Sequence, residues 1–415
     1  MARTRRRLKP AEAPPSEGVG LPAILEKARA VAARTKALSS GIDGAYKLAQ
    51  QAQVREALTR SELTLALHAA LAVRAELEAR LRDEALAAYR KGFAGRLRRH
   101  GRPSQALDRV LARLGSLGRA AVIARGGVWR GTGRGLHDLR HMAAYARRRA
   151  NPGVAPSAFL DQAWYLAANP DVAAAGASPL VQYLLSGGRE DRDPHPLFHS
   201  AWYRARHAGE IAATSVTPLE HYAGLGAGRG DAPHPAFDVA HYLAQAPDLA
   251  LGEDPASHYV RAGAAAGLSP HPLFDPAWYA RQAGKAEGAG GLVHYLTEGW
   301  RRGLSPHPLF DPAWYLETYA DLAQAGVEPL THFLTVGADH GLSPGPWFDL
   351  PAYVAQRGAG RTPGTNPLVD YLRGGAWVVA EPKPGFPTAA YLASEPELAR
   401  QGLTPLEHWA RKQAR

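Results

Sequence analysis

A single tyrosine position, repeated seven times at nearly constant spacing, constrains this 415-residue chain more than any other feature. The intervals between successive copies are 38, 39, 37, 36, 38 and 38 residues. Such a period is typical of proteins in which one small repeat cannot bury its apolar residues alone and packs on its neighbours. We therefore divide residues 156–415 into units 1 to 7, which are defined by Tyr165, Tyr203, Tyr242, Tyr279, Tyr315, Tyr353 and Tyr391.

Each unit carries the signals of two short helices, and these signals are most complete in unit 5. Asp311 and Pro312 have the residue types of an N-cap and of a first helical position, so a helix should begin there. Pro329 should begin a second helix, and Gly337 should end it in the left-handed conformation. The equivalent glycines of the other units are Gly187, Gly226, Gly263, Gly299 and Gly375.

The segment that joins one unit to the next, which we call the strap, reads Ser-Pro-His-Pro-Leu-Phe at residues 269–274 and 305–310. It is too rich in proline for a helix and should be extended. The pattern predicts an all-α fold, with an N-terminal helical domain followed by an α-solenoid-like array of seven helix-turn-helix repeats of about 37 residues.

Histidine recurs at two positions of the unit. Repeated imidazoles can bind zinc, but these are a whole unit apart in sequence, and Gln182 and Asp370 replace the second-helix histidine in two units. We therefore favour capping and packing, and expect no metal site and no cofactor. The strap histidines are His195, His234, His271 and His307, and those of the second helix are His221, His258, His294, His332 and His408.

The part before the array divides by composition into a disordered basic tail at 1–20, a helical head at 21–125 and a basic Gly/Arg-rich linker at 126–155. Thr59 and Glu62 form a capping box at the start of a long amphipathic pattern. Helices are expected at residues 22–41, 60–92 and 104–118.

Charge is distributed unequally along the chain. Residues 1–150 hold 31 basic and 12 acidic residues, a net charge of +19, whereas the remainder holds 18 basic and 26 acidic residues, a net charge of −8. An anionic lipid surface, a nucleic acid or an acidic polymer should therefore meet the basic part first. A solvated arginine-rich surface without a partner is the alternative.

The arginine-rich stretch between residues 125 and 149 is the best candidate for contact with an anionic surface. Guanidinium groups bind phosphate through two parallel hydrogen bonds, and a tryptophan can lie at an interface. A basic hinge between the head and the array explains the same composition. The candidate docking residues are Arg125, Trp129, Arg130, Arg134, Arg140, Arg147, Arg148 and Arg149.

Several classes of protein are excluded or disfavoured. The chain has no cysteine, which removes disulfides, thiolate metal sites and cysteine nucleophiles. The basic residues at the start are followed by Pro, Glu and Ser instead of an apolar core, so we expect no signal peptide. The apolar stretch at 63–73 is too short to span a bilayer.

Two motifs point weakly to sugar chemistry. Asp191 and Asp193 form an Asp-x-Asp pair like that which holds a divalent metal in many glycosyltransferases, although a solvated strap is the preferred interpretation. The tryptophan beside the repeated tyrosine could stack on sugars or belong to the shared core, and we favour the core. These tryptophans are Trp164, Trp202, Trp278 and Trp314. The glycines at 131–135 have neither an apolar strand before them nor a Lys-Ser/Thr pair after them, as a nucleotide-binding loop would, and no catalytic residue is assigned.

The array resembles a helical repeat of bacterial proteins that is often appended to glycosyltransferases and other enzymes of cell-surface polysaccharide. The resemblance covers residues 156–415 and rests on three stretches, Phe-Asp-Pro-Ala-Trp-Tyr at 274–279, Asn-Pro-Asp-Val-Ala at 169–173 and Pro-Leu-Glu-His-Tyr at 218–222. It implies a setting in surface-glycan assembly. A separate catalytic domain would accompany such a repeat, and we expect none after the last unit.

The sequence therefore favours a non-catalytic scaffold or binding protein of surface-glycan biosynthesis or export, whose basic part docks on an anionic surface. Its expected partners are other proteins of that assembly or the glycan, and its expected location is the cytoplasm, at the inner face of the membrane. A divergent or truncated glycosyltransferase and a nucleic-acid-binding protein are the alternatives.

Overall fold

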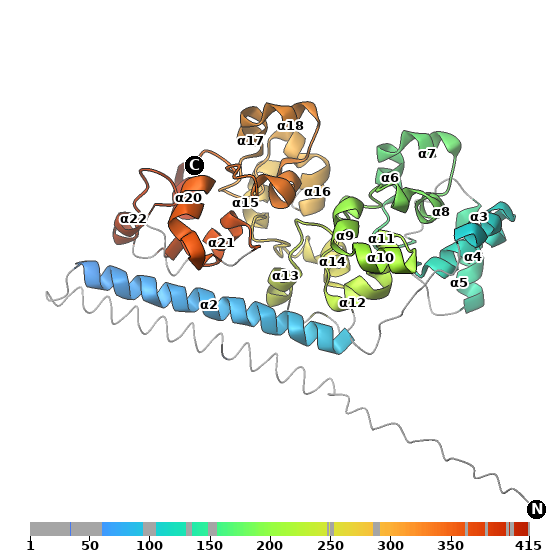
Figure 1. The fold of residues 1–415 in the computed structure, drawn as a ribbon, viewed down its shortest axis with the longest axis horizontal. Coiled ribbons are helices and arrows are strands. Elements are labelled where there is room, and N and C mark those ends of the chain that lie inside the picture. Colours follow the sequence, from blue (N-terminus) through green and yellow to red (C-terminus); the bar gives the residue numbers. More distant parts are fainter. Residues whose placement is uncertain are drawn as a thin grey trace, which may run out of the picture. The chain divides into compact units, whose positions relative to one another are not determined.

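The computed structural model describes residues 34, 60–93, 105–129, 135–147, 156–246, 249, 253–284, 291–361, 364–377, 381–395, 398 and 402–413. Within them the protein is all-α, as predicted (Figure 1). Pairing of extended backbone is limited there to three isolated bridges within the straps. The predicted tail at 1–20 and, apart from Arg34, the predicted helix at 22–41 lie outside the described residues.

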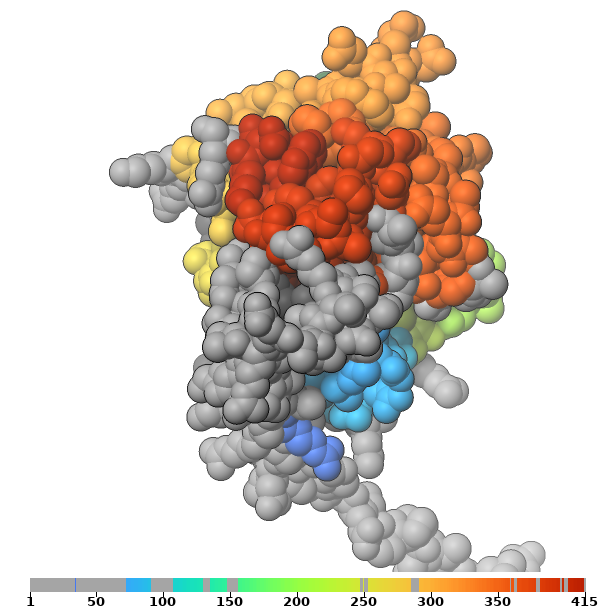
Figure 2. All heavy atoms as spheres, turned by 90° about the vertical axis from the view of Figure 1, so that its left-hand side faces the viewer, coloured from blue at the N-terminus to red at the C-terminus, as the bar shows by residue number. Residues whose placement is uncertain are grey.

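The chain divides into two compact parts, residues 1–56 and 57–415, and every helix discussed below belongs to the second. Helix α2 (Arg60–Phe93) covers the helix that was predicted after Thr59. It lies along the array, since the Tyr89 hydroxyl donates to the carbonyl oxygen of Ala227 at 2.7 Å. It also contacts α13 (Val239–Gln245) and α22 (Thr388–Ser394). Figure 2 shows the light-blue α2 below the red C-terminal units.

Three further helices precede the array. They are α3 (Gln105–Arg113), α4 (Gly115–Gly126) and α5 (Gly135–Ala146). The helix predicted at 104–118 starts as α3, but it is broken after Arg113, and α4 continues past the predicted end to Gly126. Helix α5 lies within the stretch that was expected to be a linker. Its apolar side chains explain the difference, because Met142, Ala143 and Tyr145 are buried and anchor this arginine-rich segment.

Each unit has a first helix and a second helix, as predicted. The first helices are α6 (Gln162–Ala168), α9 (Ser200–Arg206), α13, α15 (Pro276–Ala283), α17 (Pro312–Thr318), α20 (Leu350–Arg357) and α22. The second helices are α8 (Pro179–Leu185), α11 (Pro218–His221), α14 (Pro255–His258), α16 (Leu292–Thr297), α19 (Pro329–His332), α21 (Pro367–Arg373) and α24 (Pro405–Gln413). Units 1, 2 and 5 add a short helix between them, namely α7 (Pro170–Ala175), α10 (Ala208–Thr214) and α18 (Ala320–Gln324).

Most second helices continue as a further turn of different winding. This turn is a π-helix in η2 (Tyr222–Gly226), η3 (Tyr259–Gly263) and η5 (Phe333–Gly337). It is a 3₁₀-helix in η1 (Gly187–Arg189), η4 (Gly299–Arg302) and η7 (Gly375–Trp377). The short helix α12 (Ala227–Arg229) follows η2, and the 3₁₀-helix η6 (Gly358–Gly360) follows α20.

The predicted N-caps of the first helices are confirmed. Asp311 accepts the backbone N–H of Trp314 at 3.0 Å, and Asp275 accepts that of Trp278 at 2.9 Å. Each carboxylate thereby satisfies an amide that has no partner within its helix. The same bond is made by Asp161, Asp238 and Asp349.

The repeated glycines have a role different from the predicted one. The left-handed residue comes four positions later, at Gly230, Gly267, Gly303 and Gly341 and, in unit 1, at Asp191 with φ of 57°. The repeated glycines instead make room for the tyrosine of their own unit, because a Cβ atom on any of them would lie 1.8 to 2.3 Å from its hydroxyl oxygen. The prediction that Gly337 and its equivalents end the helix in the left-handed conformation was therefore wrong.

The straps are not simply extended, as was predicted, but contain a tight turn. The backbone N–H of Phe274 donates to the carbonyl oxygen of His271, and that of Phe310 to His307, both at 2.9 Å. The imidazole supports the turn, since Nδ1 of His271 accepts the backbone N–H of Leu273 at 3.0 Å. The histidine thus supports this turn in the four straps that contain it.

Candidate functional site

The first and second helices of each unit are joined through the repeated tyrosine. Its hydroxyl lies 2.6 Å from Nδ1 of the second-helix histidine in units 3 and 4 and 2.9 Å from it in units 2, 5 and 7. Where histidine is replaced, Tyr165 donates to Gln182 and Tyr353 donates to Asp370. The second-helix histidines therefore act as packing partners of tyrosine.

A second tyrosine joins one unit to the next. The Tyr259 hydroxyl accepts the backbone N–H of Leu292 at 2.9 Å, and the Tyr371 hydroxyl accepts that of Leu406 at 3.1 Å. Each acceptor lies on the second helix of one unit, and each donor lies in the first turn of the second helix of the following unit. The bond satisfies an amide that the helix itself leaves without a partner.

Contacts also join units that are not neighbours. Arg373 of unit 6 binds Asp238 of unit 3, and Arg411 of unit 7 binds Asp275 of unit 4. In both cases the arginine reaches the carboxylate that caps a first helix. A simple solenoid, in which each unit contacts only its neighbours, does not account for these two contacts.

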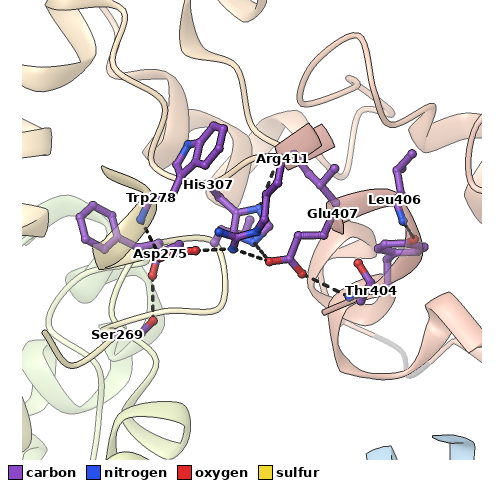
Figure 3. Close-up of polar contacts among 12 residues, drawn as sticks. Ser269, Asp275, Trp278, His307, Thr404, Leu406, Glu407 and Arg411 are labelled. Carbon is purple, nitrogen blue, oxygen red and sulfur yellow. Dashed lines mark hydrogen bonds and ion pairs between the residues drawn. The ribbon is translucent and has the colours of Figure 1, made fainter. Parts of the chain in front are cut away.

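The cluster around Arg411 shows how these distant units meet (Figure 3). Arg411 also binds Glu407 at 2.7 Å, and Nε2 of His307 lies 3.7 Å from Oε1 of that glutamate. Burial alone would raise the pKa of Asp275, but the amide of Trp278 and the Arg411 guanidinium outweigh it and lower the pKa. The cluster is a charge-paired junction that joins unit 7 to unit 4 and to the strap between units 4 and 5.

The strap histidines are buried and uncharged. The exposed fraction of His195, His234, His271 and His307 is 3 to 6%. Burial lowers the pKa of His195 to about 4 and that of His271 to about 3. In all four, Nδ1 accepts a backbone N–H. Within the described residues no group of three or more histidine, aspartate or glutamate side chains is placed to hold a metal ion.

The Asp-x-Asp pair of unit 1 is engaged in local structure. Asp191 binds Arg204 at 3.0 Å, and Asp193 accepts the backbone N–H of Ser200 at the start of α9 at 2.6 Å. Both carboxylates therefore have partners within the first two units. This engagement weakens the interpretation of the pair as a metal-binding site of a glycosyltransferase.

The four candidate tryptophans lie half-buried beside fully buried tyrosines. Trp164, Trp202, Trp278 and Trp314 are partly accessible, whereas the next residue in each case is 0% exposed. The centre of the shared core is therefore formed by the tyrosines. Two of the tryptophans make cation–π contacts. The guanidinium of Arg206 lies 4.9 Å from the ring centroid of Trp202, and that of Arg281 lies 5.3 Å from the ring centroid of Trp278.

The candidate docking residues separate into two groups. Arg125 binds the buried carboxylate of Asp108 at 2.9 Å, and Trp129 packs edge-on against Tyr145 with 5.6 Å between ring centroids. These two support the fold, whereas Arg140 and Arg147 are exposed. The remaining candidates, Arg130, Arg134, Arg148 and Arg149, lie outside the described residues.

Apolar residues that were not predicted as part of a site are exposed in the same region. The exposed fraction is 54% for Val110, 66% for Leu114, 69% for Leu117 and 79% for Leu136. Their neighbours Arg109 and Arg113 are also exposed. The sequence shows apolar residues and arginines close together over 107–117, but it does not by itself show which of the apolar residues lie outside the core.

No family model matches the chain, and no curated protein or solved structure matches it. In the part of the chain that the structure describes, none of the helices combines the length and the apolar character needed to cross a bilayer.

Proposed function

We propose that this chain is a non-catalytic repeat scaffold that holds proteins or glycan during the biosynthesis or export of bacterial surface polysaccharide. The observation that carries the proposal is that the repeated polar residues are engaged in bonds between helices. The tyrosine of every unit is bonded to the second helix, and two capping aspartates are bonded to distant units. Polar groups that are engaged in packing in this way are not free to act on a substrate, which favours a scaffold over a reaction centre.

The setting in surface-glycan assembly comes from the likeness of the repeat motif to those appended to polysaccharide enzymes. The partners are then enzymes of that assembly or the polymer itself. The partly accessible rings of Trp164 and Trp314 offer flat apolar faces of the kind that stack on sugars. The location that fits this role is the cytoplasm, with the basic helices against the inner face of the membrane.

The test is capture from the native host. The full-length tagged chain is crosslinked mildly in cells, and captured proteins are identified by mass spectrometry. A Trp164→Ala/Trp314→Ala variant is captured in parallel, and Val73→Ser on α2 is the control for a change of exposed surface elsewhere. Recovery of glycosyltransferases or export proteins that the tryptophan variant loses supports the proposal. Recovery of only ribosomal proteins and nucleic acid overturns it.

Nucleic-acid binding is the one alternative that a specific observation favours. Residues 101–150 contain eleven arginines and only two carboxylates, Asp108 and Asp138. A protein that neutralises phosphates with such a surface loses affinity steeply with salt, by a factor of about 10³ or more between 50 and 200 mM for six or more contacts. Titration of the full chain with duplex DNA and single-stranded RNA at both salt concentrations tests this alternative.

A further inference from the structure

Helix α5 occupies the place of a repeat that would precede unit 1. The Tyr145 hydroxyl accepts the backbone N–H of Leu180 at 3.3 Å. Leu180 is the residue of α8 that corresponds to Leu292 in α16 and Leu406 in α24, which are bound by Tyr259 and Tyr371 of their preceding units. Helices α3 to α5 therefore close the N-terminal end of the array.

A terminal repeat normally has a polar outer face, because nothing packs on it. The opposite is observed here. Seven large hydrophobic residues are exposed in the described part of the chain, and five of them lie between residues 107 and 136. Among the described residues of the array, only Val336 is exposed to this extent. The end formed by α3 and α4 thus keeps Val110, Leu114 and Leu117 in contact with solvent, which is unfavourable unless a partner covers them.

The charge of this end is of one sign. The two acidic residues of the region, Asp108 and Asp138, are buried, with exposed fractions of 1% and 8%. No carboxylate is therefore exposed in the described residues 105–147. Exposed positive charge is supplied by Arg109, Arg113, Arg119, Arg140 and Arg147.

We propose that the outer face of α3 and α4 docks on an anionic lipid bilayer. Val110, Leu114 and Leu117 would enter the boundary between headgroups and acyl chains, and Arg109 and Arg113 would contact lipid phosphates. Exposed apolar residues beside basic ones are the signature of segments that lie in the membrane interface. The inference rests on the proposed function only for the idea that the chain acts at an anionic surface, and it names that surface and the residues that meet it.

Other occupants fit this face less well. A second copy of the same face would bring arginines against arginines, which opposes association. A nucleic acid would satisfy the arginines but would leave the three apolar side chains in water. A bilayer of anionic lipid satisfies both kinds of side chain at once.

The test uses the full-length chain and sedimentation with vesicles at physiological salt. Vesicles of phosphatidylglycerol and phosphatidylethanolamine should retain the protein, and vesicles of phosphatidylcholine should not. Val110→Ser/Leu114→Ser/Leu117→Ser should lower the partition coefficient at least tenfold. Arg109→Gln/Arg113→Gln should lower it about thirtyfold, since one basic residue near such a surface contributes about 1 kcal/mol.

Matched controls carry the same chemical changes on other exposed surfaces. Val73→Ser/Val336→Ser and Arg281→Gln/Arg301→Gln should bind within about twofold of the wild type. Circular dichroism of every variant verifies that the helices are intact. Loss of binding in the controls as large as in the α3–α4 variants would overturn the assignment of the face, and so would failure of the wild type to bind phosphatidylglycerol.

The other occupants give distinct results that would also overturn the proposal. A wild-type dimer that the triple serine variant converts to a monomer, measured by light scattering, would assign the face to a second copy. RNA binding that the arginine variant loses and the serine variant keeps, without lipid binding, would assign it to nucleic acid. If lipid binding fails while enzymes of glycan assembly are still captured, only the docking inference fails. If lipid binding succeeds and no such enzymes are captured, only the scaffold fails.

Discussion

The array and the basic helices before it use polar and apolar residues in opposite ways. In the array most tyrosines are buried and hydrogen-bonded through their hydroxyl groups, as for Tyr279 with His294 and Tyr259 with Leu292. In α3 and α4 the carboxylate of Asp108 is buried, while Leu114 and Leu117 are exposed. The array thus buries nearly all of its large apolar side chains within the described chain, whereas the basic end leaves several of them exposed.

This difference between the array and the basic helices indicates which residues are constrained by the fold itself. At one place within the array, replacement of a tyrosine is accompanied by replacement of the residue that it would bind. Tyr222 donates to the carboxylate of Asp254, which caps the next second helix, at 2.6 Å. Where Phe333 replaces this tyrosine, the following cap is Asn366, whose own side chain accepts the N–H of Leu368 at 3.0 Å. Nothing within the described chain matches the exposed Leu114 in this way.

Acid should have the largest effect on the array. The pKa of His195 is about 4 in the folded state against 6.5 in its ordinary state because burial disfavours the charged imidazole, although Asp161 opposes this shift. Below pH 6.5 the unfolded chain therefore binds more protons than the folded one, and stability that is complete above pH 6.5 is lost as the pH falls towards 4. At about 1.4 kcal/mol per unit, His195 alone contributes about 3 kcal/mol to this loss.

Urea unfolding at pH 8, 6 and 4 measures this loss. His195→Asn keeps an acceptor near the position of Nδ1 and cannot take up a proton in this range. It should therefore flatten the dependence on pH between 6.5 and 4 by about 3 kcal/mol, while differing less from the wild type at pH 8. A variant whose profile is parallel to that of the wild type would show that this histidine is not the source of the acid sensitivity.

A methyl group added at a repeated glycine should have the next largest effect. Gly299→Ala would place a Cβ atom 1.9 Å from the Tyr279 hydroxyl oxygen, so the tyrosine would have to leave His294. Overpacking and the lost hydrogen bond together should lower the free energy of unfolding by about 3 kcal/mol. The measurement is urea unfolding at pH 8, where the strap histidines do not contribute.

Two further variants separate the clash from a general cost of alanine. Gly209→Ala lies on α10, where an added Cβ meets nothing within 4 Å, and should not destabilise the protein. Tyr279→Phe removes the hydroxyl that is in the way, so Tyr279→Phe/Gly299→Ala should cost less than the sum of its single changes. Strictly additive costs would contradict the explanation given for the repeated glycines.

The sequence could predict features that depend on neighbouring residues. Asp311 and Pro312 are adjacent, and together they predicted the start of a helix that the structure has. The role of the repeated glycines was predicted wrongly because it depends on a tyrosine hydroxyl far along the chain. In unit 5, 22 residues separate Tyr315 from Gly337, and no local rule connects the two. The junction of Asp275 with Arg411 was beyond reach for the same reason, since 136 residues separate them.

The basic helices were predicted less well because composition concealed their pattern. Glycine and arginine around α5 indicated a linker, although Met142 and Tyr145 were sufficient to bury one side of a helix. The candidate arginines were selected by charge, and charge does not distinguish Arg125, which pairs with Asp108, from the exposed Arg140. The exposed Leu117 could have been found only by asking which apolar residues lack a place in the core.

Removal of one tyrosine hydroxyl should have a smaller effect on stability, and it tests whether α5 belongs to the array. Tyr145→Phe removes the hydroxyl that accepts the N–H of Leu180, and Tyr259→Phe removes the equivalent bond to Leu292. Each loses one buried hydrogen bond and leaves an amide without its partner, so each should lower the free energy of unfolding by about 1 kcal/mol. Urea unfolding measures both. If Tyr145→Phe costs nothing while Tyr259→Phe has its full effect, α5 does not serve as a repeat.

The smallest effect on the free energy of unfolding is expected for the exposed apolar residues of α3 and α4. Val110→Ser/Leu114→Ser/Leu117→Ser exchanges three residues with exposed fractions of 54 to 69%, so little contact is lost on the folded side. Changes at exposed positions usually alter stability by no more than about 0.5 kcal/mol each. Three buried positions of the array would instead cost several kcal/mol in total, at about 2 to 5 kcal/mol for each large apolar side chain that is removed. Thermal unfolding of the triple variant therefore tests whether these residues stabilise the fold or are available to a partner. A large drop in the melting temperature would place them in a core, and the docking face would then lose its apolar residues.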